Sequence, residues 1–205
     1  SADQFAVEVW RSSLLDILIS AGPVRKLLQL PYVSLGELFK GRESLLDDLS
    51  TCLGPIPQHK DSPAASTALT GLGGVGKTRL ALEYAWRHSS DYAALLLVNA
   101  DGAQALDRNL AALCAATILD LSENNERDEG RQRAAVVDWL KQHPGWLLIL
   151  DNVDSESAAS AVEALLPRLT GGHVLVTSRL PNWRAGIEIL PVDVLSPDAA
   201  ADFLL

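Results

Sequence analysis

The stretch GLGGVGKTRL, residues 71–80, lies between an apolar run at 66–70, STALT, and a helical pattern at 77–88, KTRLALEYAWRH. It fits the pattern G-x-x-x-x-G-K-[ST], which is typical of a loop that wraps a phosphate group. The defining positions are filled by Gly71, Gly76, Lys77 and Thr78. Because the glycines stand where a buried strand passes into a helix, we interpret the stretch as a phosphate-binding loop (P-loop) rather than as a simple tight turn.

The residue types of this loop suit the binding of a nucleotide. Glycines adopt positive φ and have no Cβ, so consecutive backbone N–H groups can curl round a phosphate. The helix that starts at Lys77 directs its positive dipole end to the same point. We expect Lys77 to reach the β- and γ-phosphates of ATP, or the β-phosphate of ADP, and the Thr78 hydroxyl to ligate Mg²⁺. The residues expected to contact the nucleotide here are Gly71, Gly73, Gly74, Val75, Gly76, Lys77, Thr78 and Arg79.

A carboxylate for the metal is supplied by the run WLLILDNVD at 146–154. Asp151 ends the apolar part of this run, and the carboxyl end of a buried strand is where ligands bind in open α/β sheets, so we expect Asp151 to bind Mg²⁺. Asn152 stands where many ATPases have a second acid that orients or deprotonates the attacking water. An amide can hold a water but cannot take its proton, so hydrolysis is expected to be slow or to need help. Asp154 is a further acid nearby, with a direction that the sequence does not give.

A second buried run, HVLVTSR at 173–179, ends in hydroxyls and a guanidinium at the same predicted edge. We expect Arg179 to belong to the catalytic site and to sense a γ-phosphate by bidentate contact. The alternative is an arginine that only extends into solvent from the end of a strand. The chain has no N-K-x-D motif for reading guanine, which favours ATP over GTP.

Strand-like and helical patterns alternate from residue 66 onward. The apolar runs are 66–70, 92–98, 146–151, 173–178 and 187–192. The helical patterns between them are 77–88, 103–119, 131–142 and 156–169, and a further one at 43–53 precedes the first run. Strands that are apolar without alternation are typical of a parallel sheet with both faces covered. The sequence therefore predicts a three-layer α/β fold.

Composition and charge narrow the classes of partner. The chain has 205 residues, of which 48% are apolar, and this size suits one domain. A net charge of −9 without a block of Lys or Arg disfavours nucleic acid as a partner. The apolar runs are well short of the roughly 20 residues that span a membrane. Cys52 and Cys114 have neither zinc-site nor disulfide spacing, so a cytoplasmic setting is expected.

Three segments are expected along the chain. Residues 1–30 have apolar positions at helical spacing before a Gly-Pro break, which predicts a linker helix. Residues 31–195 would form the nucleotide-binding domain, and 196–205 would begin a further helical subdomain. The chain has no methionine, so we expect it to be a piece of a longer protein.

Together with the P-loop, three motifs resemble those of the NB-ARC nucleotide-binding domains, in the STAND class of P-loop NTPases: LFKGRE at 38–43, LILDNVD at 148–154 and VLVTSR at 174–179. That class includes plant disease-resistance receptors, the apoptosome scaffold and bacterial regulators. The resemblance implies a sheet of five parallel strands, with the P-loop strand between the strand that ends at Arg179 and the last strand. It further implies that the adenine and ribose side is lined by Phe39, Lys40 and Arg42.

The resemblance also implies a switch. Such domains hold ADP in a closed resting state, exchange it for ATP when a sensor region detects a ligand, and open to self-associate and activate an effector. Sensor and effector domains would lie outside this chain. The pair Asp151–Asn152 departs from the acidic pair common in the family, and this predicts slow turnover. Two alternatives remain: a scaffold that binds nucleotide without hydrolysing it, and a metabolic kinase, which should carry a lid with clustered arginines that the sequence lacks.

Overall fold

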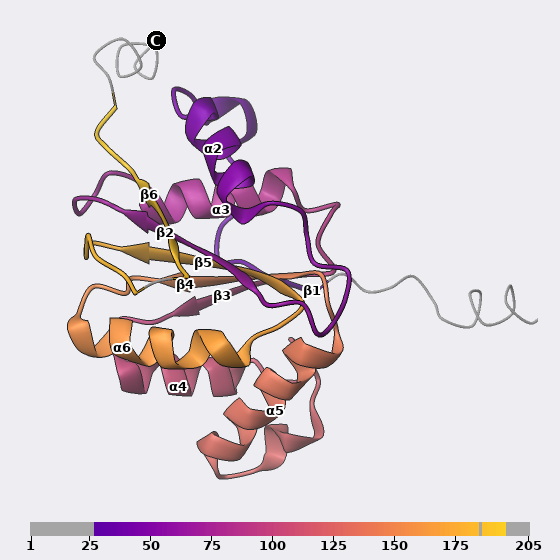
Figure 1. Cartoon of the computed structure of the whole chain (residues 1–205). Helices are drawn as coiled ribbons and strands as arrows, with labels where there is room; N and C mark the ends of the chain where they lie inside the picture. Colours follow the sequence, from indigo (N-terminus) through magenta and orange to yellow (C-terminus); the bar gives the residue numbers. More distant parts are fainter. Residues whose placement is uncertain (1–26, 185, 196–205) are drawn as a thin grey trace, which may run out of the picture.

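A computed structural model describes residues 27–184 and 186–195, which build one six-stranded sheet between two layers of helices (Figure 1). The strands are β1 (Leu27–Gln29), β2 (Ala65–Thr70), β3 (Ala94–Asn99), β4 (Trp146–Asp151), β5 (Gly172–Ser178) and β6 (Glu188–Pro191). The α-helices are α2 (Glu43–Leu53), α3 (Lys77–Arg87), α4 (Ala103–Ala112), α5 (Glu129–Gln142) and α6 (Glu156–Leu165). Short 3-10 helices are η1 (Gly36–Leu38), η2 (Ser122–Asn125) and η3 (Leu166–Arg168). None of the described helices has both the length and the apolarity to cross a membrane. The predicted three-layer α/β fold is confirmed.

The two faces of the sheet are covered by different helices (Figure 1). Helices α2 and α3 pack on one face, in an apolar cluster that includes Leu147 and Ile149 of β4. Helices α4, α5 and α6 pack on the other face, where the cluster includes Leu148 and Leu150. Successive β4 side chains therefore enter opposite cores, and all six residues of this strand are buried. Burial on both faces explains why the strand has no polar alternation in its sequence.

The sheet has one strand more than the five that were predicted. The strand order is β1-β3-β4-β5-β2-β6, and neighbouring strands are parallel. The P-loop strand β2 lies between β5 and β6, as the resemblance implied. The additional strand, Leu27–Gln29, pairs with the first half of β3. It replaces the end of the linker helix predicted over 1–30; the rest of that helix, and the subdomain predicted over 196–205, fall outside the described residues.

Helix α4 ends at Ala112, although the apolar pattern predicted a helix up to residue 119. After Ala112 the chain folds back, and the Leu119 backbone N–H donates to the Leu113 carbonyl at 3.2 Å. Leu113, Cys114 and Leu119 are all buried in the core beneath α4 and α5. Their apolar character therefore reflects burial in a turn, which periodicity alone does not distinguish from burial on a helix.

Candidate functional site

The P-loop leaves the carboxyl end of β2 and enters α3, and its glycines are required by the backbone. Gly74 and Gly76 have φ values of 81° and 95°, in the left-handed region that favours glycine. At Gly71, φ is 152° and a Cβ would lie only 2.3 Å from the Val192 carbonyl oxygen. The Val192 N–H in turn donates to the Thr70 carbonyl at 2.6 Å. The start of the loop is thus packed against the segment that leaves β6, with no room for a side chain at Gly71.

Lys77, the first residue of α3, is buried inside the loop. Its Nζ donates to the carbonyl oxygens of Gly71 and Leu72, at 2.9 and 2.8 Å. Burial lowers the pKa of Lys77, while the nearby charges of Asp154 and Arg179 respectively raise and lower that pKa. The ammonium is therefore within electrostatic reach of two residues that directly follow β4 and β5, as the predicted site requires.

The Thr78 hydroxyl lies directly beside the carboxylate of Asp151. Thr78 Oγ1 donates to Asp151 Oδ1 at 2.7 Å, and Thr177 Oγ1 donates to the same oxygen at 2.6 Å. Thr177 Oγ1 also accepts from the Asn152 backbone N–H at 3.0 Å. Asp151 is buried, so these hydroxyls fix its position at the ends of β4 and β5. The two residues expected to bind the metal are brought together.

Asn152 and Arg179 line one pocket with the P-loop. The lining residues of this pocket, about 410 Å³ in volume, are Gly73, Gly74, Gly76, Lys77, Thr78, Arg79, Asn152, Asp154, Thr177 and Arg179. Asn152 has a φ of 63°, a left-handed conformation that Asn tolerates better than most residues. Arg179 donates to Asp154 twice, from its backbone N to Oδ1 and from Nε to Oδ2, both at 2.7 Å. Residues that directly follow β4 and β5 therefore line the pocket together with the loop.

The pocket fits a nucleotide polyphosphate with Mg²⁺. The loop presents backbone without Cβ atoms at Gly73, Gly74 and Gly76, and a helix N-terminus follows directly. The oxygens of Thr78 and Asp151, at 2.7 Å from each other, are ligands of the type that Mg²⁺ prefers. Positive charge to balance phosphate oxygens comes from three residues of the lining, Lys77, Arg79 and Arg179.

Phe39 and Lys40 lie away from this pocket, whereas Arg42 contacts the P-loop. Arg42 is buried, and its Nη2 donates to the carbonyls of Val75 and Asp193, both at 2.8 Å. Phe39 and Lys40 line a separate hollow beside α3, where the Phe39 ring packs under the Arg87 guanidinium at 5.6 Å. The structure therefore joins Arg42 to the phosphate loop, and leaves the adenine contacts of Phe39 and Lys40 as a prediction.

A segment at 32–35 connects the LFKGRE motif at 38–43 to α3, the helix that follows the P-loop. Glu83 of α3 is fully buried and accepts from the Ser34 hydroxyl at 2.6 Å and the Leu35 N–H at 3.0 Å. Arg79, predicted to touch nucleotide, donates to the Val33 carbonyl at 3.0 Å and also lines the phosphate pocket. Polar residues of α3 thus fix the chain that leads into the LFKGRE motif.

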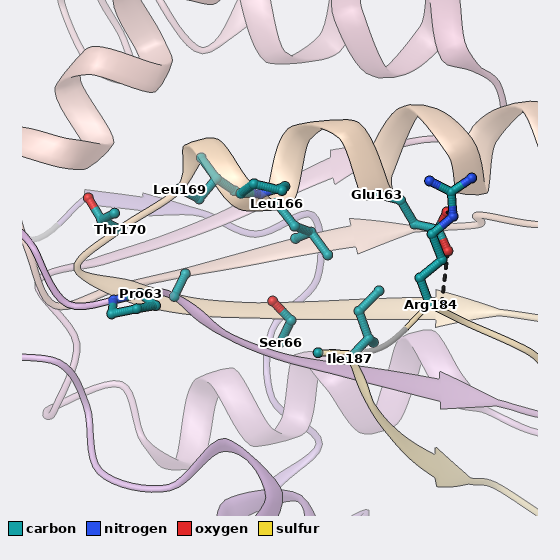
Figure 2. Close-up of a pocket in the computed structure, with 11 residues that line it drawn as sticks. Pro63, Ser66, Glu163, Leu166, Leu169, Thr170, Arg184 and Ile187 are labelled. Atoms are coloured by element: carbon teal, nitrogen blue, oxygen red, sulfur yellow. Dashed lines mark hydrogen bonds and ion pairs between the residues drawn. The ribbon is translucent and has the colours of Figure 1, made fainter.

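A further hollow, here called the α6 hollow, has a volume of about 470 Å³ (Figure 2). It lies between α6 and the part of the sheet where β2, β5 and β6 begin. It is lined largely by apolar side chains, and Glu163 and Arg184 stand at one end of it (Figure 2). Glu163 accepts from the Arg184 backbone N at 3.0 Å and contacts Arg184 Nε at 2.8 Å. Glu163 thus contacts both the backbone N and the Nε of Arg184, as Asp154 does with Arg179. No P-loop residue lines this hollow.

Two residues gain a clear place only in the structure. The Thr177 hydroxyl belongs to the run at 173–179 that was predicted to end at the edge of the sheet, but its hydrogen bonds to both Asp151 and Asn152 depend on the β4–β5 pairing. The sequence does not show which way the Asp154 side chain points, and in the structure it points toward Arg179. The only sequence signal for this pair was that both residues follow buried runs predicted to end at the same edge.

Comparison with known proteins gives one family and several relatives. Residues 56–204 match the NB-ARC domain family. The regulatory protein AfsR of Streptomyces griseus is 30% identical over 166 residues, which are 79% of this chain and 16% of that protein. A nucleotide-binding leucine-rich repeat (NLR)-like protein of Hyaloscypha variabilis is 27% identical over 175 residues, 76% of this chain and 17% of its own length. AfsR of Streptomyces coelicolor is 30% identical over 168 residues, 79% of this chain and 17% of that protein. The chain spans about a sixth of the length of these relatives.

Proposed function

The chain belongs to the NB-ARC family, and from that premise we propose that it is an ATP/ADP-binding switch domain in which slow, Mg²⁺-dependent ATP hydrolysis controls activation and self-association. A regulatory protein and an NLR-like protein among its relatives support a nucleotide-binding signalling domain. The sensor and effector regions would then belong to other parts of a longer cytoplasmic protein.

One observation carries this proposal: Thr78 and Arg179, from elements far apart in the sequence, line a single pocket with Lys77. In the proposed site, Lys77 and the loop amides bind the phosphates, and Thr78 and Asp151 hold Mg²⁺. Mg²⁺ would neutralise charge on the phosphate oxygens. Arg179 would distinguish ATP from ADP by contacting the oxygens that only ATP has.

Slow turnover is proposed on the chemistry of Asn152. Its amide lines the pocket and can orient a water by hydrogen bonds, but it has no basic site to take a proton. Asp154, the acid that lines the pocket, directs both carboxylate oxygens to Arg179. Both oxygens of this carboxylate accept from Arg179 and so are not directed at an attacking water, and the site therefore favours holding a nucleotide over rapid turnover.

The alternative function is a scaffold that binds nucleotide without hydrolysing it, and Asn152 is the residue that favours it. A single-turnover assay of phosphate release from ATP separates the two functions. The switch requires slow release that is lost in Lys77→Ala, whereas the scaffold requires no release above that of the variant.

A further inference from the structure

Asp154 and Arg179 make a two-point contact at the wall of the phosphate pocket. The carboxylate binds both the backbone N–H and the Nε–H of the arginine, so it fixes the start of the side chain and one edge of the guanidinium. The Arg179 side chain is 60% exposed and the Asp154 side chain 25% exposed. An exposed arginine would otherwise sample many rotamers, and this contact limits them.

The stem of Arg179 also lies along the P-loop. A Cβ added at Gly73 would be 3.8 Å from Arg179 Cδ, which is ordinary contact distance. The arginine therefore lies close to Gly73 of the loop and is also bound by Asp154. The guanidinium is a rigid planar fork, and with its Nε edge on Asp154 its Nη donors can still engage a phosphate in bidentate fashion.

We propose that Asp154 is a positioning residue that holds Arg179 ready for the terminal phosphate of ATP. This inference rests on the function proposed above. It assigns to Asp154 no direct contact with nucleotide, because the carboxylate acts through Arg179. Removal of the carboxylate should weaken the binding of ATP without affecting the binding of ADP.

The sign of the effect distinguishes positioning from simple electrostatics. The Asp154 charge acts on Lys77, so it is close enough to repel the added negative charge of a γ-phosphate. If Asp154 acted only as a nearby charge, its removal would tighten ATP binding. If it positions Arg179, its removal weakens ATP binding.

The chain contains a matched control in the Glu163–Arg184 pair (Figure 2). Glu163 accepts from the backbone N and contacts the Nε of its arginine, in the same two-point arrangement as Asp154. This pair lies at the α6 hollow, which no P-loop residue lines. Glu163→Ala and Arg184→Ala therefore remove an equivalent contact without touching the proposed site.

The test measures the affinities of the 205-residue chain for ADP and for the non-hydrolysable analogue AMP-PNP, both with Mg²⁺, by calorimetry. We expect Asp154→Ala and Arg179→Ala each to weaken the affinity for AMP-PNP about tenfold, since a hydrogen bond to a charged group is lost in either case. The affinity for ADP should stay within about twofold of that of the parent. The double variant should be no weaker than either single variant, because both act through one contact. The two control variants should change neither affinity.

Asp154→Asn provides a second variant of the same size. It should also weaken the binding of AMP-PNP, because it replaces one of the two oxygens that accept from Arg179 with an NH₂ group, which is a donor. Its melting temperature and the ¹H–¹⁵N signal of Arg179 Nε, measured without nucleotide, report separately on folding and on the contact. Unchanged or tighter AMP-PNP binding in the Asp154 variants, with weaker binding in Arg179→Ala, would overturn the inference. Unchanged binding in Arg179→Ala would also overturn it and would leave nucleotide binding intact. A parent chain that binds neither nucleotide would instead refute the proposed function.

Discussion

The hydroxyl of Thr78 donates a hydrogen bond to Oδ1 of Asp151 over 2.7 Å, and so joins the first turn of α3 to the last residue of β4. The two residues are 73 positions apart in the sequence. Parallel strands carry their carboxyl ends to one edge of the sheet, which is why a loop after β2 and an acid at the end of β4 can meet.

Asp151→Asn should reduce the dependence of nucleotide affinity on Mg²⁺. The amide has the size of the carboxylate and can still accept from Thr78, but it lacks the charge that favours a divalent cation. We expect the gain in ADP affinity on adding Mg²⁺ to shrink by about tenfold, as judged by titrations with Mg²⁺ and with a chelator. Asp138→Asn, which removes an exposed partner of Lys141 on α5, is the control. An unchanged Mg²⁺ dependence in Asp151→Asn would exclude this residue from the metal site.

Gly71→Ala should destabilise the fold more than Gly74→Ala. At Gly71 the new Cβ would meet the Val192 carbonyl at 2.3 Å, whereas at Gly74 it would meet no atom within 4 Å. Gly74→Ala adds only the strain of a left-handed alanine, about 1 kcal/mol. Gly71→Ala adds a steric clash with backbone and should lower the free energy of unfolding by about 2 kcal/mol or more. Urea denaturation of the two variants measures the difference, and equal losses would contradict the close approach to Val192.

Arg42→Ala should lower stability and also weaken nucleotide binding. The buried guanidinium joins the Val75 carbonyl of the P-loop to the Asp193 carbonyl after β6, and its loss leaves both acceptors without this donor. We expect a loss of about 2 kcal/mol in the free energy of unfolding. The control is Lys40→Ala, two positions away and exposed, which should change the unfolding free energy little. A stable Arg42→Ala chain with unchanged ADP affinity would show that this contact does not support the loop.

Stability should fall on acidification because of His173, which is buried on β5. Its Nδ1 lies 2.7 Å from the Tyr92 hydroxyl and its Nε2 lies 3.3 Å from the Pro55 carbonyl. Burial lowers the pKa of His173 below its ordinary value of 6.5, so the folded state favours the neutral ring. The unfolded chain then binds more protons as the pH falls below 6.5, and stability decreases from there down to the lowered pKa.

The variant His173→Gln tests this pH dependence. It removes the titrating ring, so the difference in unfolding free energy between pH 7.5 and 5 should be smaller than in the parent. Urea melts at the two pH values give the comparison, which cancels the contribution of carboxylates common to both chains. An identical pH dependence in parent and variant would mean that His173 does not titrate differently on folding.

The juxtaposition of the P-loop, Asp151 and Arg179 could be predicted because each lies in a local pattern. The P-loop, the run that ends at Asp151 and the run that ends at Arg179 each carry their signal in a few consecutive residues. Strand β4 has the bounds that its apolar run predicted, because a strand buried on both faces leaves a continuous pattern. The order of β2 between β5 and β6 came from the family resemblance and is confirmed.

The remaining features depend on tertiary contacts that no local pattern records. Strand β1 has only three residues, and it is a strand because β3 provides a partner. Arg42 donates to the carbonyl of Asp193, which is 151 positions away in the sequence. That it links the P-loop to the segment after β6 could therefore not be read from the LFKGRE motif. The direction of Asp154 likewise depends on the turn after β4 and on the neighbouring strand β5.

The most direct test of the central claim is calorimetric titration of the 205-residue chain with ADP and with AMP-PNP in the presence of Mg²⁺, beside Lys77→Ala. We predict one nucleotide bound per chain, and an affinity at least about tenfold weaker in the variant, because Lys77 supplies a charged donor to the phosphates. Absence of binding to the folded parent chain, or equal affinity in Lys77→Ala, would contradict the account.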